Sequence, residues 1–168
     1  QNEPVGTRIF GPVVRELLNL RTTLLITYTQ TRSEDALDAA ALLLPWPEAE
    51  RTAALERCTS LALNFRAATN VALPISSALL VERGRGIDEL VSARLVSMYR
   101  GLRALGVVDA EAAQSAALLS LSDGDAGWIV SRVDALHSYL SRFSPIPLWS
   151  AAASLALLGY DYLRGPQL

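Results

Sequence analysis

The sequence contains no lysine, one cysteine and one histidine. A single cysteine, Cys58, excludes a disulfide within the chain, and a single histidine, His137, excludes the multi-histidine sites that hold zinc. Charged residues make up 19% of the chain and the formal net charge is −2. The basic surplus that is typical of nucleic-acid binding is therefore missing. We expect no metal, no other cofactor and no nucleic-acid partner.

Long apolar runs are also scarce. The longest charge-free run has 18 residues, from Phe143 to Tyr160. Pro145 and Pro147 leave only its second part for a regular helix, which is too short to cross a bilayer. The chain starts without a basic segment followed by an apolar one, so a signal peptide is not expected. The sequence predicts a cytoplasmic protein with no membrane span.

Hydrophobic residues, in contrast, make up 51% of the 168 residues. This content suffices for one well-filled core, and we expect a single domain over residues 1–168. Apolar residues recur at spacings of three and four, which is typical of amphipathic helices. The β-branched segment from Thr22 to Thr29 has no second strand to pair with, so it is also expected to be helical. The sequence predicts an all-α fold of about eight helices, over residues 12–30, 33–44, 47–69, 74–83, 87–105, 110–121, 126–143 and 147–163.

Start and stop signals flank these segments. Prolines suit first-turn positions, acids suit N-caps or first turns, and glycines suit the left-handed position that ends a helix. Thr31 and Glu34 have the spacing of a capping box. The prolines are Pro12, Pro47, Pro74 and Pro147, the acids are Asp88 and Asp109, and the glycines are Gly84 and Gly106.

A short internal repeat organises the predicted helices. Two small residues followed by two leucines occur at Ala40–Leu43, Ser77–Leu80 and Ala116–Leu119, with a looser copy at Ala152–Leu155. Counted between Leu42, Leu79, Leu118 and Leu155, the spacings are 37, 39 and 37 residues, and each copy follows a longer, more polar helix. Periods of this size are typical of stacked helical repeats. We expect four antiparallel hairpins over about 12–44, 47–83, 87–121 and 126–163, arranged as an α-solenoid-like array or as a compact bundle.

The segment from Tyr99 to Gly106 has the form Tyr-x-x-Leu-x-x-x-Gly, and the Ala116–Leu119 copy follows it. This combination resembles bacterial all-helical families of unknown function that carry such pairs, over the C-terminal two-thirds of the chain. The resemblance implies a helical fold, and it assigns no activity and no site residue.

Residues with chemical potential are few, and each has a structural interpretation. Cys58 shares an apolar helix face with Leu61 and Phe65, the usual setting of a buried thiol. His137 borders the apolar stripe of its helix. A general base, or a haem ligand together with Met98, is the alternative, but the sequence lacks a Cys-x-x-Cys-His attachment motif. We expect structural roles for these residues.

The charged motifs are also expected to have structural roles. Residues 123–127 resemble part of a calcium loop, yet Asp134 stands where the pattern needs glutamate, so a glycine-rich turn capping the next helix is expected. The Gly84–Gly86 turn precedes Asp88 and Glu89, whose charge would repel an anion. The densest run of basic residues is expected to form a solvated surface on which some arginines pair with acids. It consists of Arg83, Arg85, Arg94, Arg100 and Arg103.

The last predicted helix is apolar almost all the way round, although the terminal element of a solenoid needs a polar outer face. It either inserts between other helices or forms an interface, for which Trp149, Leu155, Tyr160 and Tyr162 are the candidates. The sequence favours a non-enzymatic interaction module that binds a protein or itself. The alternative is a small-molecule-binding helical domain with an apolar pocket of Phe65, Tyr99, Tyr139 and Trp149.

Overall fold

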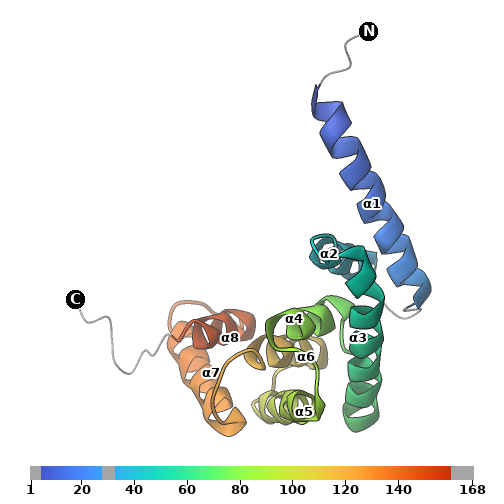
Figure 1. Cartoon of the computed structure of the whole chain (residues 1–168). Helices are drawn as coiled ribbons and strands as arrows, with labels where there is room; N and C mark the ends of the chain where they lie inside the picture. Colours follow the sequence, from blue (N-terminus) through green and yellow to red (C-terminus); the bar gives the residue numbers. More distant parts are fainter. Residues whose placement is uncertain (1–4, 28–32, 160–168) are drawn as a thin grey trace.

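The computed structural model describes residues 5–27 and 33–159, and this part of the chain forms eight α-helices and no strand (Figure 1). The predicted all-α fold is confirmed, including the β-branched segment up to Thr27. The helices are α1 (Val5–Thr27), α2 (Ser33–Leu43), α3 (Glu48–Thr69), α4 (Ile75–Arg85), α5 (Glu89–Ala104), α6 (Asp109–Leu119), α7 (Ala126–Leu140) and α8 (Trp149–Leu157).

The helices pack as consecutive hairpins in two layers. α1 packs on α2, α3 on α4, α5 on α6 and α7 on α8. Between hairpins, α3 packs on α5 and α5 on α7, while α2, α4, α6 and α8 follow one another in a second row. Each hairpin thus contacts mainly the one before and the one after it. This neighbour-to-neighbour order is that of an α-solenoid.

The small-small-Leu-Leu copies all lie on the second row, on α2, α4, α6 and α8. The first residue of every copy is buried: Ala40, Ser77, Ala116 and Ala152. Side chains of this size allow two helix backbones to approach closely, and neighbouring alanines such as Ala78, Ala117 and Ala153 are buried with them. The repeat pattern therefore marks the row along which the hairpins touch.

Two interhelical carboxylates reinforce this row. Asp35, at the start of α2, accepts hydrogen bonds from the backbone N–H groups of Ile75 (2.9 Å) and Ser76 (3.2 Å) and from the Ser76 hydroxyl. Glu111, at the start of α6, accepts bonds from the backbone N–H (3.2 Å) and hydroxyl (2.8 Å) of Ser150. Each carboxylate thus caps the second helix of the following hairpin, whose first N–H groups have no partner within their own helix.

The loop between α6 and α7 is held by two arginines. Arg85 donates to the carbonyl oxygens of Ser120 (3.0 Å) and Ser122 (2.9 Å) and forms an ion pair with Asp123. Arg94 donates to the carbonyl oxygens of Ser122 (2.7 Å) and Gly124. The pKa of Arg94 is lowered chiefly by burial and further by the positive charge of Arg85. Two of the five arginines of the predicted basic run, Arg85 and Arg94, thus hold this loop.

Several helix ends differ from their predicted positions. α1 begins at Val5, so Pro12 lies inside it; the helix continues because proline keeps a helical φ and removes a single N–H bond. Pro47 and Pro74 occupy N-caps instead of first turns. Gly84 lies within α4, where a Cβ would stand 2.6 Å from the Leu121 side chain, and Gly86 takes the positive φ beyond the helix.

Other predicted signals are confirmed. Asp88 is the N-cap of α5 and accepts a bond from the N–H of Val91 (2.7 Å). Gly106 has a φ of +90°, and Asp109 lies in the first turn of α6. The proposed capping box of Thr31 and Glu34 lies outside the described residues and side chains.

Cys58 lies in the core on α3, fully buried as its apolar neighbours predict. Burial raises the pKa of its thiol to about 12, and the charge of Glu82 adds to the shift. Glu82 is itself buried and accepts bonds from Arg57 Nε (2.6 Å) and from the N–H of Ile87 (3.1 Å). The thiol is therefore a packing group and not an accessible nucleophile.

We expect Asp35→Ala to lower the free energy of unfolding by about 1–2 kcal/mol, because the first N–H groups of α4 lose their acceptor. Glu111→Ala should cost less, since its bonds to Ser150 are solvent-exposed. Asp38→Ala, at an exposed position of α2, is the control. Urea denaturation measures all three, and equal losses for Asp35→Ala and Asp38→Ala would contradict the capping role.

The buried thiol predicts a pH dependence of stability. The pKa of Cys58 is raised to about 12 in the folded chain from the ordinary thiol value of 9.0. Thiolate formation then favours the unfolded state between these values, and the free energy of unfolding should fall with rising pH by roughly 1 kcal/mol per unit. The fall is measured as the difference between wild type and Cys58→Ala in denaturation series from pH 8 to 11. A difference that does not change with pH would refute it.

Candidate functional site

The α1 helix carries two adjacent apolar seams. Leu17, Leu20 and Leu24 form the inner seam, with Leu24 fully buried. Val14, Leu18 and Leu25 form an outer seam at spacings of four and seven residues, with Arg21 between the leucines. Val14 and Leu18 are 51% and 49% exposed, and Leu25 is partly buried. One seam of α1 is therefore covered, and the other is largely open.

The difference in helix length leaves this outer seam uncovered. α1 has 23 residues and α2 has 11, which correspond to about 35 Å and 17 Å at 1.5 Å per residue. α1 therefore projects beyond α2 and away from the other hairpins (Figure 1). Its ion pair between Glu16 and Arg51 (2.8 Å) ties the helix to α3. We call this outer seam, in which Val14 and Leu18 are exposed, the α1 apolar face.

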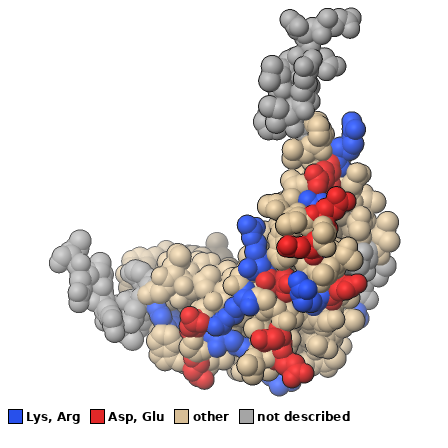
Figure 2. All heavy atoms as spheres, in the orientation of Figure 1, with Lys and Arg blue, Asp and Glu red and all other residues tan. Residues whose placement is uncertain are grey.

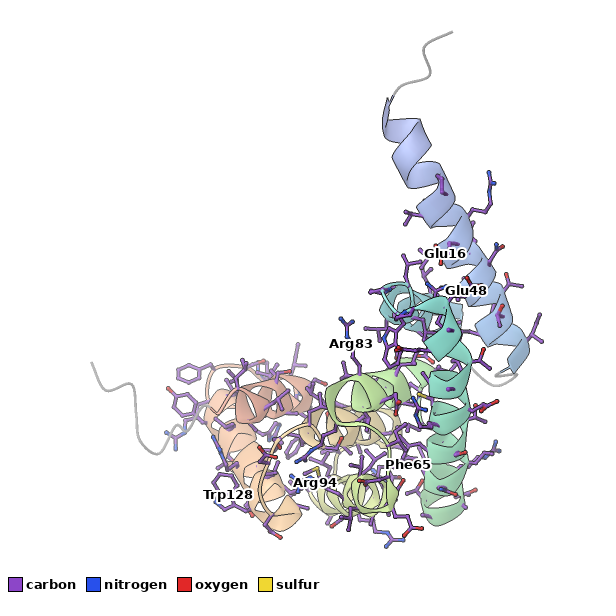
Figure 3. All side chains as sticks on the ribbon, in the orientation of Figure 1. Glu16, Glu48, Phe65, Arg83, Arg94 and Trp128 are labelled. Atoms are coloured by element: carbon purple, nitrogen blue, oxygen red, sulfur yellow. The ribbon has the colours of Figure 1, made fainter. Side chains whose placement is uncertain are left out.

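A second surface feature is an open groove between α3 and α5, with a volume of about 470 Å³. Leu61 and Phe65 of α3 and Val96 of α5 supply its large apolar side chains, and Arg100 supplies its charge. Phe65 points from α3 toward α5 (Figure 3). There the rings of Phe65 and Tyr99 form a T-shaped pair, with centroids 5.2 Å apart and planes at 78°. We call this the α3–α5 groove.

The four aromatic residues of the predicted pocket are distributed over three ring pairs. Phe65 packs on Tyr99, and Tyr139 packs on Phe143 with ring centroids 5.4 Å apart. Trp149 stacks on His137, with ring centroids 3.5 Å apart and an angle of 6° between the planes. Of the four, Phe65 lines the α3–α5 groove. The Tyr99 hydroxyl donates a hydrogen bond to Asp109 (2.9 Å). The pKa of Tyr99 is raised chiefly by burial and further by this bond.

The candidate interface residues of the last helix lie in different settings. α8 packs on both α6 and α7, with Ala152, Ala153 and Ala156 buried. Trp149 is used in the His137 stack, and Leu155 is partly buried against the core. Tyr160 and Tyr162 lie outside the described residues. α8 therefore packs on two neighbours, α6 and α7, while Ala151 and Ser154 on its other side are exposed.

The acidic residues that the sequence analysis singled out near α7 serve a helix cap and an ion pair. No group of three or more potential metal-ligating side chains occurs among the described residues. Asp125 caps α7 by accepting from the N–H of Trp128 (2.9 Å), as the turn interpretation predicts, and Asp123 pairs with Arg85. Figure 2 shows acidic and basic atoms interspersed on the visible face. Across residues 5–27 and 33–159, no helix is long and apolar enough to cross a membrane.

Sequence reasoning missed both surface features. The outer seam was signalled by Val14, Leu18 and Leu25, which lie one residue away from the inner seam. The sequence pattern gave less indication of the α3–α5 groove. Ala93 and Arg100 line a common groove only because α5 packs beside α3, which the sequence does not show.

The comparisons with known proteins add no residue role. No family model, no curated protein and no solved structure matches this chain.

Proposed function

We propose that this chain is a non-enzymatic interaction module that self-associates through the α1 apolar face. The observation that carries the proposal is the open outer seam of α1. A helix with two adjacent seams has the pattern of one that packs between two neighbours, and α2 covers one of them. The proposed occupant of the other is α1 of a second copy.

The geometry of α1 favours an identical partner. Since its N-terminal half projects beyond α2, two copies of α1 can lie side by side in antiparallel orientation with their bodies at opposite ends (Figure 1). Val14 of one copy then faces Leu25 of the other. Leu18 stands opposite the aliphatic stem of Arg21. A two-fold rotation axis relates the two copies in this pairing, which is the commonest symmetry of homodimers.

The chemistry of the described residues supports a non-catalytic role. The acids in the interior are used as helix caps or in ion pairs, as for Asp35, Glu82 and Glu111. The buried thiol of Cys58 has a raised pKa, and His137 is stacked on Trp149. These groups lack the nucleophile, base and orienting partner that a reaction needs.

We expect wild type to form a dimer in light-scattering and sedimentation measurements over a concentration series. Leu18→Glu should raise the dissociation constant about tenfold or more, because it places charge in the apolar seam. Leu63→Glu, at a position of α3 that is 63% exposed, is the matched control and should leave the dimer intact. Circular dichroism checks that each variant keeps its helical content.

Two results would overturn the proposal. One is a monomeric wild type at every concentration, which would leave the α1 apolar face to a helix of a different protein. The other is a dimer that survives both Leu18→Glu and Val14→Glu, which would place the interface elsewhere.

A further inference from the structure

The α3–α5 groove has a size and lining that suit a small ligand. Its volume of about 470 Å³ lies within the usual range for ligand sites, roughly 300–1,000 Å³. Small side chains at Ala68 and Ala93 leave space beside the larger Leu61, Phe65 and Val96. Leu61 and Phe65 are each 1% exposed and belong to the core, so this side of the groove is firmly supported.

The charge of the groove selects the kind of ligand. Arg100 is the charged residue among those that line it, and the polar residues Asn64, Ser92 and Ser97 are neutral. Arg100 Nη2 donates to the carbonyl oxygen of Ala68 (3.2 Å), which directs the guanidinium toward α3 across the groove. A guanidinium has five N–H donors, so this bond leaves donors for an anion. Carboxylates are the anions that arginine binds in a bidentate way.

The helices set the length of the ligand. The groove runs from Leu61 to Ala68 on α3 and from Ser92 to Arg100 on α5, which is about 10–12 Å at 1.5 Å per residue. Its open form suits a flexible apolar chain lying along it. A long acyl chain would extend beyond its ends.

From these observations we infer that the α3–α5 groove binds a small amphipathic carboxylate. Its apolar chain lies on Ala68, Ala93 and Val96, above the buried Leu61 and Phe65, and its carboxylate lies on Arg100. The small-molecule alternative from the sequence thereby gains a site that shares Phe65 with the predicted pocket. This site goes beyond self-association, because it lies on α3 and α5 and not on the α1 apolar face. Each proposal can fail without the other.

The test uses octanoate and its neutral analogue 1-octanol as probes, followed by methyl and backbone NMR shifts of the full chain. We expect octanoate to shift the signals of Ala68, Ala93 and Val96 in a saturable way. Arg100→Gln should weaken octanoate binding about tenfold or more, since it removes the charge-assisted bonds, and should leave 1-octanol binding unchanged. Arg83→Gln removes the same charge from an exposed position on α4 and is the matched control.

A second variant tests the apolar part of the groove. Ala93→Leu, at an exposed lining position, should fill the groove and weaken both probes while the chain remains folded. Three results would overturn the inference: no saturable shifts with octanoate, equal octanoate binding by wild type and Arg100→Gln, or shifts confined to residues outside the groove. Equal loss of affinity in Arg83→Gln and Arg100→Gln would also overturn it, because the effect would then reflect net charge alone.

Discussion

The close packing of small side chains along α2, α4, α6 and α8 is the constraint on which the rest of the structure depends. Ala40, Ser77, Ala116 and Ala152 are buried where each of these helices meets its neighbours. A larger side chain at such a position would push two backbones apart, and a close-packed interior tolerates little added volume. This row fixes the order of the hairpins, and the longer helices α3, α5 and α7 follow as the second layer.

The carboxylate caps link particular pairs of neighbouring hairpins within this packing. Asp35 and Glu111 each lie five residues before a repeat copy, and each caps the second helix of the next hairpin. The equivalent position of the second hairpin is Ala72, which has no carboxylate. The caps therefore join the first hairpin to the second and the third to the fourth, while Arg85 and Arg94 hold the loop that leads into the fourth. Polar bonds and apolar packing specify the same order of helices.

The two candidate surfaces arise where this regular packing ends or widens. α1 is about twice as long as α2, so its outer seam extends beyond the stack. The α3–α5 groove lies between two first-layer helices and is lined in part by small residues such as Ala68 and Ala93, with Arg100 at one end. One surface is apolar and suits a helix of a second copy, whereas the other combines an apolar lining with one cation. Assembly and ligand binding would therefore use separate parts of the fold.

The sequence by itself determined the helical class and most helix positions, because periodicity and helix ends depend on neighbouring residues. It also determined the burial of Cys58 and the caps at Asp88 and Asp125. Tertiary structure alone decided the packing of α8 on α6 and α7, the caps from Asp35 and Glu111, and the α3–α5 groove. The physical reason is distance along the chain: these features join residues roughly 30 to 40 positions apart, whose contact depends on how whole helices pack and not on any local pattern.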